Sequence, residues 1–325
     1  MLRKLSYAAL FIMLCTACNE RQSTSETTYM QQSPDFNADS AYLYVAEQCQ
    51  FGPRVMNSAA HDSCATYIAN KFRQYGATVT NQDATATLYD GTEVGMRNII
   101  ASFGMDKPAR IIICSHWDSR PWADHDPDAQ YHHSPIDGAN DGASGVGVLI
   151  EIARQIQKAE PQVGVDLICF DAEDCGTPEW DDSGMPDAHT WCLGSQYWAA
   201  HRHTDGYSAR YGILLDMVGG NNCVFEKETM SMYYAPSIVD KVWAKAQRLG
   251  YTDLFSNSQG TGVTDDHIQV NQSGIPCIDI IARDKNSNTF CTTWHTMADN
   301  ISNINKQTLK AVGQTVLEVI YTEQP

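Results

Sequence analysis

Four short apolar runs constrain the fold of this chain more than any other feature of its sequence. Each has the length of a β-strand and lacks a regular alternation of apolar and polar residues. The runs are "RIIICSH" (110–116), "VDLICF" (165–170), "YGILLDMVGG" (211–220) and "IPCIDIIA" (275–282). Strands of this kind are buried on both faces, which is typical of a sheet that helices cover on both sides.

Segments with helical periodicity alternate with these strands and cover residues 58–76, 141–160, 194–203, 237–250 and 306–321. A further strand, "RNIIASF" (97–103), is joined to 110–116 by a connection too short for a crossover helix. We therefore expect these two strands to run antiparallel and the sheet to be mixed. No linker divides residues 37–325. The sequence predicts the α/β class, as a single domain with a central twisted mixed β-sheet flanked by helices on both faces.

The first 18 residues have the pattern of an export signal. Two basic residues precede an apolar stretch at 8–14, and a small pair stands directly before Cys18. This pattern resembles a bacterial lipoprotein signal, in which the cysteine is lipidated and becomes the new N-terminus; ordinary cleavage without a lipid is the alternative. Residues 19–36 are polar and predict a flexible tether. We expect an exported, periplasmic protein anchored to a bacterial membrane through Cys18.

The charge of the chain excludes two classes of partner. Twenty-two lysines and arginines stand against 39 acidic residues, which gives a net charge of −17. This charge opposes binding to nucleic acid or to an anionic membrane surface. It suits metal ions and substrates that carry a positive group. Contact with a membrane is expected only through the N-terminal lipid, and we expect the protein to be a monomer.

The cysteines leave the disulfide question open. Of the eleven in the chain, Cys114, Cys169 and Cys277 lie inside apolar runs and are expected to be small core residues. Cys175 and Cys192 flank an insertion and could be bridged, because export permits disulfides. Among the nine cysteines that follow the predicted signal, the irregular spacing and the absence of a C-x-x-C pair argue against a disulfide scaffold or a zinc finger.

Polar side chains that can bind metals follow the predicted strands. They are His116, Asp118, Asp141, Glu173, Asp174, Asp216, Asp265, Asp266, His267 and His295. Ligands of open α/β sheets collect at the carboxyl ends of the strands. A mixture of carboxylates and imidazoles favours zinc, and a catalytic zinc needs about three protein ligands and an open position. The pattern therefore predicts a zinc site at one edge of the sheet.

Each of these residues also has an ordinary structural explanation. Asp141 alone would be a helix N-cap, and Asp265 with Asp266 would be a turn. Asp216 is harder to explain in this way, because a carboxylate inside an apolar strand is buried and needs a partner. Motifs of competing chemistries are missing: the sequence has no G-x-S-x-G, phosphate-binding loop, G-x-G-x-x-G or H-E-x-x-H.

Six motifs in fixed order carry a family resemblance. They are "HWDS", "GANDGASGVGVLIEIAR", "FDAEDCG", "LLDMVG", "DDHIQVNQSGIPCIDI" and "WHTMADN". Over about 90–325 the chain resembles the zinc-dependent M28 peptidase superfamily, whose fold is a central twisted mixed sheet flanked by helices. Two branches compete. Aminopeptidases of the family bind two zincs and hydrolyse N-terminal residues, whereas animal-type glutaminyl cyclases bind one zinc and convert the N-terminal glutamine of peptides or proteins to pyroglutamate, releasing ammonia.

Four features are more similar to the cyclase branch. Trp294 precedes His295 where aminopeptidases commonly have tyrosine, "DDH" replaces "SDH", Trp180 follows the acidic pair, and "GSQYW" comes next. Core packing is the alternative explanation for each tryptophan. One departure is Glu173-Asp174, where animal cyclases have two glutamates; the shorter aspartate would bring the metal nearer to its strand. The resemblance therefore favours a glutaminyl-peptide cyclotransferase, with a two-zinc aminopeptidase and a non-catalytic peptide-binding lipoprotein as alternatives.

The resemblance also implies a ligand set for the metal. In the cyclase branch, Asp141, Asp174 and His295 would bind one zinc per chain, which would polarise the γ-carboxamide oxygen of the substrate. His116 and Asp216 correspond to ligands of the second zinc in the peptidases. They would therefore lie close to the first site, as second metal ligands or as groups around the first metal.

The remaining roles are carried over in the same way. Glu173 would take a proton from the substrate amine and deliver it to the departing ammonia. Asp216 would hold the amine, and Asp265 would complete the hydrogen-bond network, with Asp266 as the alternative for that role. Trp180 and Trp294 would wall the pocket and exclude water. The insertion at 117–140 has three histidines and several aspartates; it could shape the pocket mouth or bind a cation, and we expect a solvated loop over the site.

Overall fold

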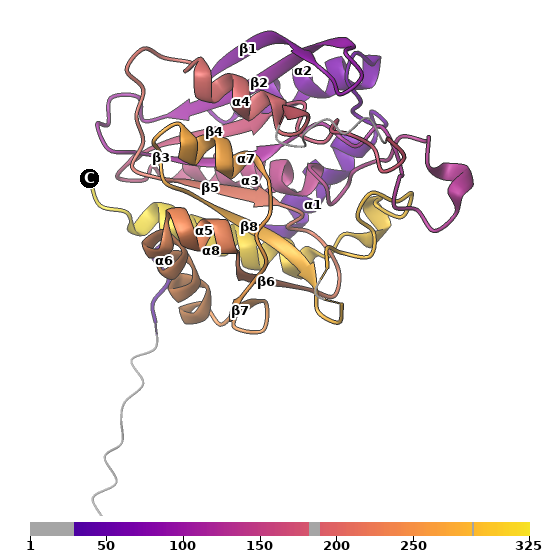
Figure 1. Ribbon diagram of the computed structural model, residues 1–325. Coiled ribbons are helices and arrows are strands. Elements are labelled where there is room, and N and C mark those ends of the chain that lie inside the picture. The colour runs from indigo at the N-terminus through magenta and orange to yellow at the C-terminus, as the bar shows by residue number, and fades with distance from the viewer. Residues whose placement is uncertain (1–28, 182–188, 288) are drawn as a thin grey trace, which may run out of the picture. The chain divides into compact units, whose positions relative to one another are not determined.

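An eight-stranded mixed sheet forms the centre of the computed structural model, which describes residues 29–181, 189–287 and 289–325 (Figure 1). Its strand order is β1-β2-β4-β3-β5-β8-β6-β7. The four central strands are parallel to one another: β4 (Gly164–Phe170), β3 (Arg110–His116), β5 (Gly212–Asp216) and β8 (Cys277–Asp284). Their carboxyl ends therefore meet at one edge of the sheet, as the apolar runs predict.

The outer strands make the sheet mixed. They are β1 (Thr78–Thr87), β2 (Glu93–Phe103), β6 (Cys223–Lys227) and β7 (Phe255–Gln259). Strand β2 is antiparallel to β1 and β4, and β6 is antiparallel to β8 and parallel to β7. The predicted mixed sheet is confirmed, but β2 and β3 are not neighbours, because β4 lies between them. They still run in opposite directions. Their short connection is long enough to span the width of the one strand that lies between them.

Helices cover both faces of the sheet (Figure 1). One face carries α1 (Ala38–Cys49), α2 (Ala59–Gln74), α3 (Ala143–Lys158) and α8 (Lys306–Thr322). The other carries α4 (Leu193–Ala200), α5 (Thr229–Tyr234) and α7 (Asp266–Gln272), while α6 (Pro236–Arg248) packs against α8 and β7. Two short 3-10 helices span Ala129–Tyr131 and Ile301–Asn303. The predicted α/β class with two covered faces is confirmed.

Strand β3 shows why both faces need helices. Ile111 and Ile113 point into the larger apolar cluster with α1, α3 and α8, whereas Ile112 and Cys114 point into a second cluster with Trp198 of α4. All four β3 side chains are fully buried. Burying one such aliphatic side chain stabilises the fold by about 1.5–3 kcal/mol, so losing either helix layer would expose half of each strand.

The cysteines are all free within the described residues. Cys114, Cys169 and Cys277 are fully buried, as expected for small core residues. Cys175 and Cys192 are also buried and unbridged, so the bridge that the sequence left open is not formed. Within the same part of the chain, no helix has both the length and the apolar composition needed to cross a membrane.

The compact unit begins at Gln31 rather than at residue 37. Ser33 donates hydrogen bonds from its backbone N–H and its hydroxyl to Glu318 Oε2, at 2.9 and 2.7 Å, and the Phe36 N–H donates to Gln314 Oε1 at 2.9 Å. The Phe36 ring is buried against α8. Residues 31–36, which composition assigned to the tether, therefore belong to the domain. The predicted signal lies in residues 1–28, outside the described part of the chain.

The contact between Phe36 and Gly313 gives a stability prediction. A Cβ on Gly313 would stand 2.2 Å from the Phe36 ring, so Gly313→Ala should cost roughly 1–3 kcal/mol of unfolding free energy by overpacking. In a Phe36→Ala background the space is free, and the same substitution should become neutral or stabilising because alanine favours helix. Urea unfolding of the four proteins measures this. An equal cost in both backgrounds would contradict the proposed contact.

Candidate metal centre and active site

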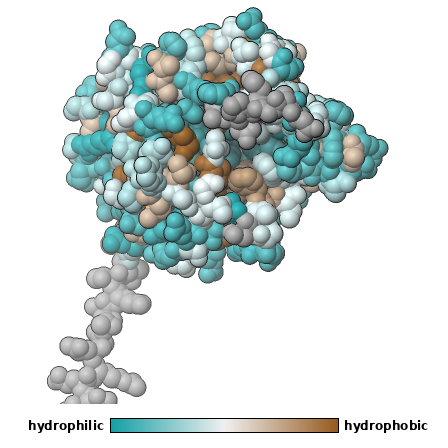
Figure 2. Space-filling model, in the orientation of Figure 1, coloured by the Kyte–Doolittle hydropathy of each residue, from teal (hydrophilic) through white to brown (hydrophobic). Residues whose placement is uncertain are grey.

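The carboxyl ends of the parallel strands surround a cavity of about 340 Å³. His116 and Asp216 are the last residues of β3 and β5, and Glu173 with Asp174 follows β4. The walls of the cavity include seven residues that the sequence predicted for the site: Asp141, Glu173, Asp174, Asp216, Asp265, Trp294 and His295. On the face of the molecule seen in Figure 2 the surface is mostly hydrophilic, with a few small hydrophobic patches.

Asp141, Asp174 and His295 form a buried triad. The His295 Nε2 atom lies 3.1 Å from Asp174 Oδ1 and 3.7 Å from Asp141 Oδ2. Two atoms bound to a tetrahedral zinc at about 2.1 Å are about 3.4 Å apart, so these spacings fit zinc. Both carboxylate oxygens of Asp174 are buried without a hydrogen-bond partner among the described residues. The triad therefore has the donor atoms and the spacing that a zinc ion requires.

The charges of the triad depend on one another. Burial disfavours the charged form of His295, but the carboxylates of Asp174 and Asp124 outweigh it and raise the pKa of the imidazole to about 9. Burial raises the pKa of Asp174 to about 6. Without a cation His295 therefore holds a proton at neutral pH, and a metal would have to displace it.

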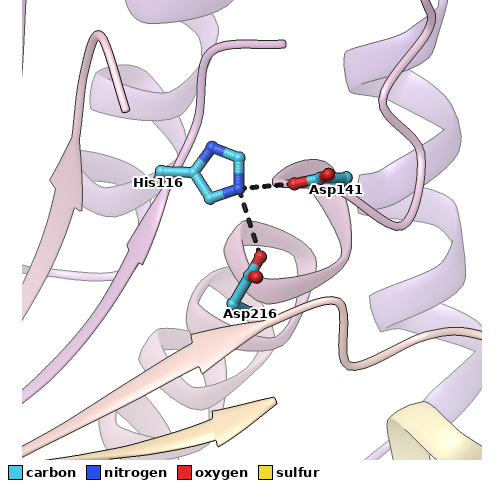
Figure 3. Close-up of side chains that lie close together, drawn as sticks. All are labelled: His116, Asp141 and Asp216. Atoms are coloured by element: carbon cyan, nitrogen blue, oxygen red, sulfur yellow. Dashed lines mark hydrogen bonds and ion pairs between the residues drawn. The ribbon is translucent and has the colours of Figure 1, made fainter. Parts of the chain in front are cut away.

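His116 connects Asp141 to Asp216 in a second triad (Figure 3). Its Nε2 atom lies 2.9 Å from Asp141 Oδ1 and 3.2 Å from Asp216 Oδ1, and its Nδ1 atom lies 3.5 Å from Asp118 Oδ1. Burial lowers the pKa of His116, but its hydrogen bonds to these three carboxylates outweigh that effect and raise it well above its ordinary value. Asp141 contributes Oδ1 to this triad and Oδ2 to the first one, so it could bridge two metal ions. Alternatively, a protonated His116 could supply the positive charge between Asp141 and Asp216.

Two buried aspartates that are not ligands of either triad fix the backbone of the metal site. Asp299 accepts hydrogen bonds from the N–H groups of Asn140 (2.7 Å) and Asp141 (3.1 Å). Asp118 accepts from the N–H groups of Glu173 (3.1 Å) and Asp174 (3.0 Å). Each carboxylate thus holds two consecutive peptide groups. The helix α3 has no side-chain cap, so the Asp141 carboxylate is not used as an N-cap and is available to the site.

Part of the 117–140 insertion is buried beneath the site. Arg120 is 1% exposed and donates hydrogen bonds to the carbonyl oxygens of Asp174 (3.1 Å) and Gly176 (3.0 Å). Asp124, paired with Arg120, lies 3.4 Å from His295 Nδ1. The expectation of a solvated loop is therefore wrong for this part of the insertion, because Arg120 and Asp124 lock the loop onto the metal site.

Glu173, Asp216 and Asp265 form the acidic side of the cavity. Burial, together with the nearby Asp265 and Asp174 carboxylates, raises the pKa of Glu173 well above its ordinary value, although His116 opposes this. Burial and Asp216 raise the pKa of Asp265 in the same way. Glu173 and Asp265 therefore take up a proton more readily than ordinary carboxylates do, which suits general acid–base catalysis.

The aromatic walls differ from the prediction at one position. Trp294 lines the cavity with its ring 3.9 Å from that of His295, as the sequence suggests. Trp180 does not line the cavity; it is 38% exposed and packs against Trp122 and His133. Trp191 takes the predicted place, with its ring parallel to that of His295 at 6.0 Å. The sequence could have indicated Trp191 through its position directly before "CLGS", where a helix begins.

The comparisons with known proteins agree with this geometry. The model of Peptidase family M28 matches residues 98–320. A glutaminyl cyclase of Bacteroides thetaiotaomicron is 52% identical with a TM-score of 0.88, and the match covers 90% of this chain and all of that one. A Zn-dependent exopeptidase of Parabacteroides distasonis is 53% identical with a TM-score of 0.87 and the same coverage.

A more distant relative belongs to the aminopeptidase branch. Aminopeptidase YwaD of Bacillus subtilis is 26% identical over 264 residues; the match covers 77% of this chain and only half of that protein. The two solved structures have nearly equal identity to this chain but different enzyme names. The names alone therefore do not choose between cyclase and peptidase, and the residues of the cavity have to decide.

The role of Asp299 can be tested by metal binding. Asp299→Ala removes the acceptor that holds the Asn140 and Asp141 peptide groups, so we expect zinc affinity to fall roughly 10- to 100-fold. Titration against a competing chelator measures the affinity. Asp205→Ala, which removes an exposed carboxylate, is the control and should bind zinc like the unchanged protein. A folded Asp299→Ala protein with unchanged zinc affinity would refute the role.

Proposed function

Because the chain belongs to Peptidase family M28, we propose that it is a zinc-dependent glutaminyl-peptide cyclotransferase of that family. Its substrates would be peptides or proteins with an N-terminal glutamine, which it converts to pyroglutamate with release of ammonia. One observation carries the proposal: Glu173, Asp216 and Asp265 line the same cavity as the metal triad, and Trp191 and Trp294 wall it.

Asp141, Asp174 and His295 would hold one zinc ion, which would supply a Lewis acid for the γ-carboxamide oxygen of the substrate. The other residues act on the reacting nitrogen atoms. Asp216 accepts a hydrogen bond from the substrate α-amine and so holds it near the amide carbon. Glu173 takes a proton from this amine as the new C–N bond forms.

The same proton completes the reaction. Glu173 returns it to the amide nitrogen, the old C–N bond breaks, and ammonia leaves, so one carboxyl group serves both half-steps. Its raised pKa suits this exchange, because the carboxyl group takes up a proton more readily than an ordinary glutamate does. Asp265 has a carboxylate oxygen within 4.8 Å of Glu173 and would complete the hydrogen-bond network around the reacting groups.

The aromatic walls favour cyclisation over hydrolysis. Water in the cavity would convert the amide to an acid, whereas the substrate amine closes the ring. Trp191, Trp294 and Phe290 supply apolar surface beside the triad and reduce the space for water. A hydrolase needs the opposite arrangement, with a water molecule admitted to the metal.

A two-zinc aminopeptidase is the second candidate. The observation that favours it is the shared Asp141, which could bridge a zinc in each triad. We propose one zinc instead, since a charged His116 satisfies Asp141 and Asp216 without a second cation.

Incubation with Gln-peptides tests the function directly. We expect ammonia to appear and the peptide mass to fall by that of ammonia. In Glu173→Gln the zinc ligands remain but no group moves the proton, so the rate should fall roughly 10²- to 10⁴-fold with zinc retained.

Three outcomes would contradict the proposal or part of it. Release of free N-terminal amino acids with two zincs per chain would favour the aminopeptidase. Unchanged turnover by Glu173→Gln would remove its role as proton carrier. Gln-peptides that bind without turnover would indicate a non-catalytic binding protein.

We propose further that the protein is exported and held at a bacterial membrane, as a monomer, through lipidated Cys18. The N-terminal residue pattern supports this. In a bacterial host, Cys18→Ser should move the protein from the membrane fraction to the soluble fraction, measured by fractionation and by the mass of the mature N-terminus. A soluble, unlipidated original protein would contradict the proposal.

A further inference from the structure

The segment at 191–195, "WCLGS", is fastened to the end of strand β4 by its backbone. The N–H groups of Cys192, Leu193 and Gly194 donate to the carbonyl oxygens of Glu173, Ala172 and Asp171, at 3.0, 3.0 and 2.9 Å. Consecutive donors thus meet consecutive acceptors in antiparallel order. The segment that brings Trp191 to the cavity also fixes the backbone next to Glu173.

The backbone conformations of the two segments show how closely this contact is specified. Cys192 (φ +58°, ψ +35°) and Ala172 (φ +52°) both adopt the left-handed conformation, which side-chain-bearing residues rarely adopt. Such residues persist when their surroundings over-determine them, and they cluster at functional sites. Gly194 approaches so closely that a Cβ there would lie 2.2 Å from the Asp171 carbonyl oxygen.

The thiol of Cys192 points at the carboxylate of Glu173. Its sulfur lies 3.2 Å from Glu173 Oε1, and the side chain is almost fully buried. Among the described residues, no other side chain donates a hydrogen bond to this carboxylate. Burial and the nearby Glu173 carboxylate raise the pKa of the thiol well above its ordinary value, so the sulfur keeps its hydrogen and remains a donor.

We propose that Cys192 is a positioning residue for Glu173. Its thiol donates a hydrogen bond to Oε1, so the carboxyl group cannot rotate freely and Oε2 remains available to exchange protons with the substrate. This role rests on the proposed function, because it assigns proton transfer to Glu173. The competing explanation is that Cys192 is only a small core residue, like Cys169, which is equally buried on β4 but is placed inside the apolar core.

Three variants separate the two explanations in the Gln-peptide assay. Cys192→Ala removes the donor, and we expect kcat to fall roughly three- to tenfold with KM unchanged. Cys192→Ser keeps a donor of similar size and should retain kcat within about twofold of the original protein, since a hydroxyl donates a comparable bond. Cys169→Ala is the matched control for loss of a buried thiol and should not change kcat.

The kinetic result can overturn the proposal in two ways. If Cys192→Ala keeps its original kcat, the thiol does not position Glu173. If Cys192→Ser, with native zinc content and native circular dichroism, loses as much kcat as Cys192→Ala, the residue is needed only for its packing. Zinc content is measured for each variant, so that a lost metal is not mistaken for a lost hydrogen bond.

Infrared spectroscopy tests the contact without any activity. The S–H stretching band of Cys192 is isolated by subtracting the spectrum of Cys192→Ser, and that of Cys169 by subtracting the spectrum of Cys169→Ala. We expect the Cys192 band at the lower frequency, and we expect it to rise in Glu173→Gln. The contact would be overturned if Cys192 and Cys169 had S–H bands of equal frequency, or if the Cys192 band did not shift in Glu173→Gln. A protein that has this band but no cyclase activity would instead refute the proposed function.

Discussion

Repulsion between buried carboxylates is the constraint on which the rest of this site depends. Glu173 and Asp174 are adjacent in sequence, and Asp141, Asp216 and Asp265 line the same cavity. Like charges at such distances out of water are costly unless each is compensated. The structure compensates them in different ways: imidazoles pair with carboxylates in both triads, where a metal could also bind, and raised pKa values make protonation of Glu173 and Asp265 easier. The means of compensation decides whether a carboxylate can be a ligand or a proton carrier.

The fold makes this arrangement possible because the ends of the central strands cannot move. Strand β4 is buried along its whole length, so Asp171 and the residues after it start from a fixed point. Asp118 then holds the peptide groups of Glu173 and Asp174 from one side, and Cys192 holds the Glu173 carbonyl from another. Repelling side chains are thus kept together by backbone hydrogen bonds that do not depend on their charge.

The sequence predicted what is set by local pattern. The apolar runs predicted the α/β class with helices on both faces of a mixed sheet, and the polar residues after them predicted most of the cavity residues. Contacts between distant segments could not be predicted. Trp180 and Trp191 lie close together in the sequence, and only the packing of Trp180 against Trp122 shows that Trp180 faces away from the cavity. Strand β1 was missed for a related reason, since an exposed edge strand lacks the apolar signal and is defined by its pairing with β2.

The aspartate at position 174 illustrates how a residue identified by local sequence pattern depends on contacts with a distant segment. Its side chain is one methylene shorter than the glutamate that animal cyclases have there, so a ligand role depends more closely on where the backbone places it. That backbone is held from two sides, because Arg120 donates to the carbonyl oxygens of Asp174 and Gly176 while Asp118 accepts from the Asp174 N–H. Since Asp124, the partner of Arg120, also contacts His295, the insertion that supplies Arg120 holds two of the three proposed ligands at once. The buried insertion therefore fixes the backbone on which a shorter ligand would depend.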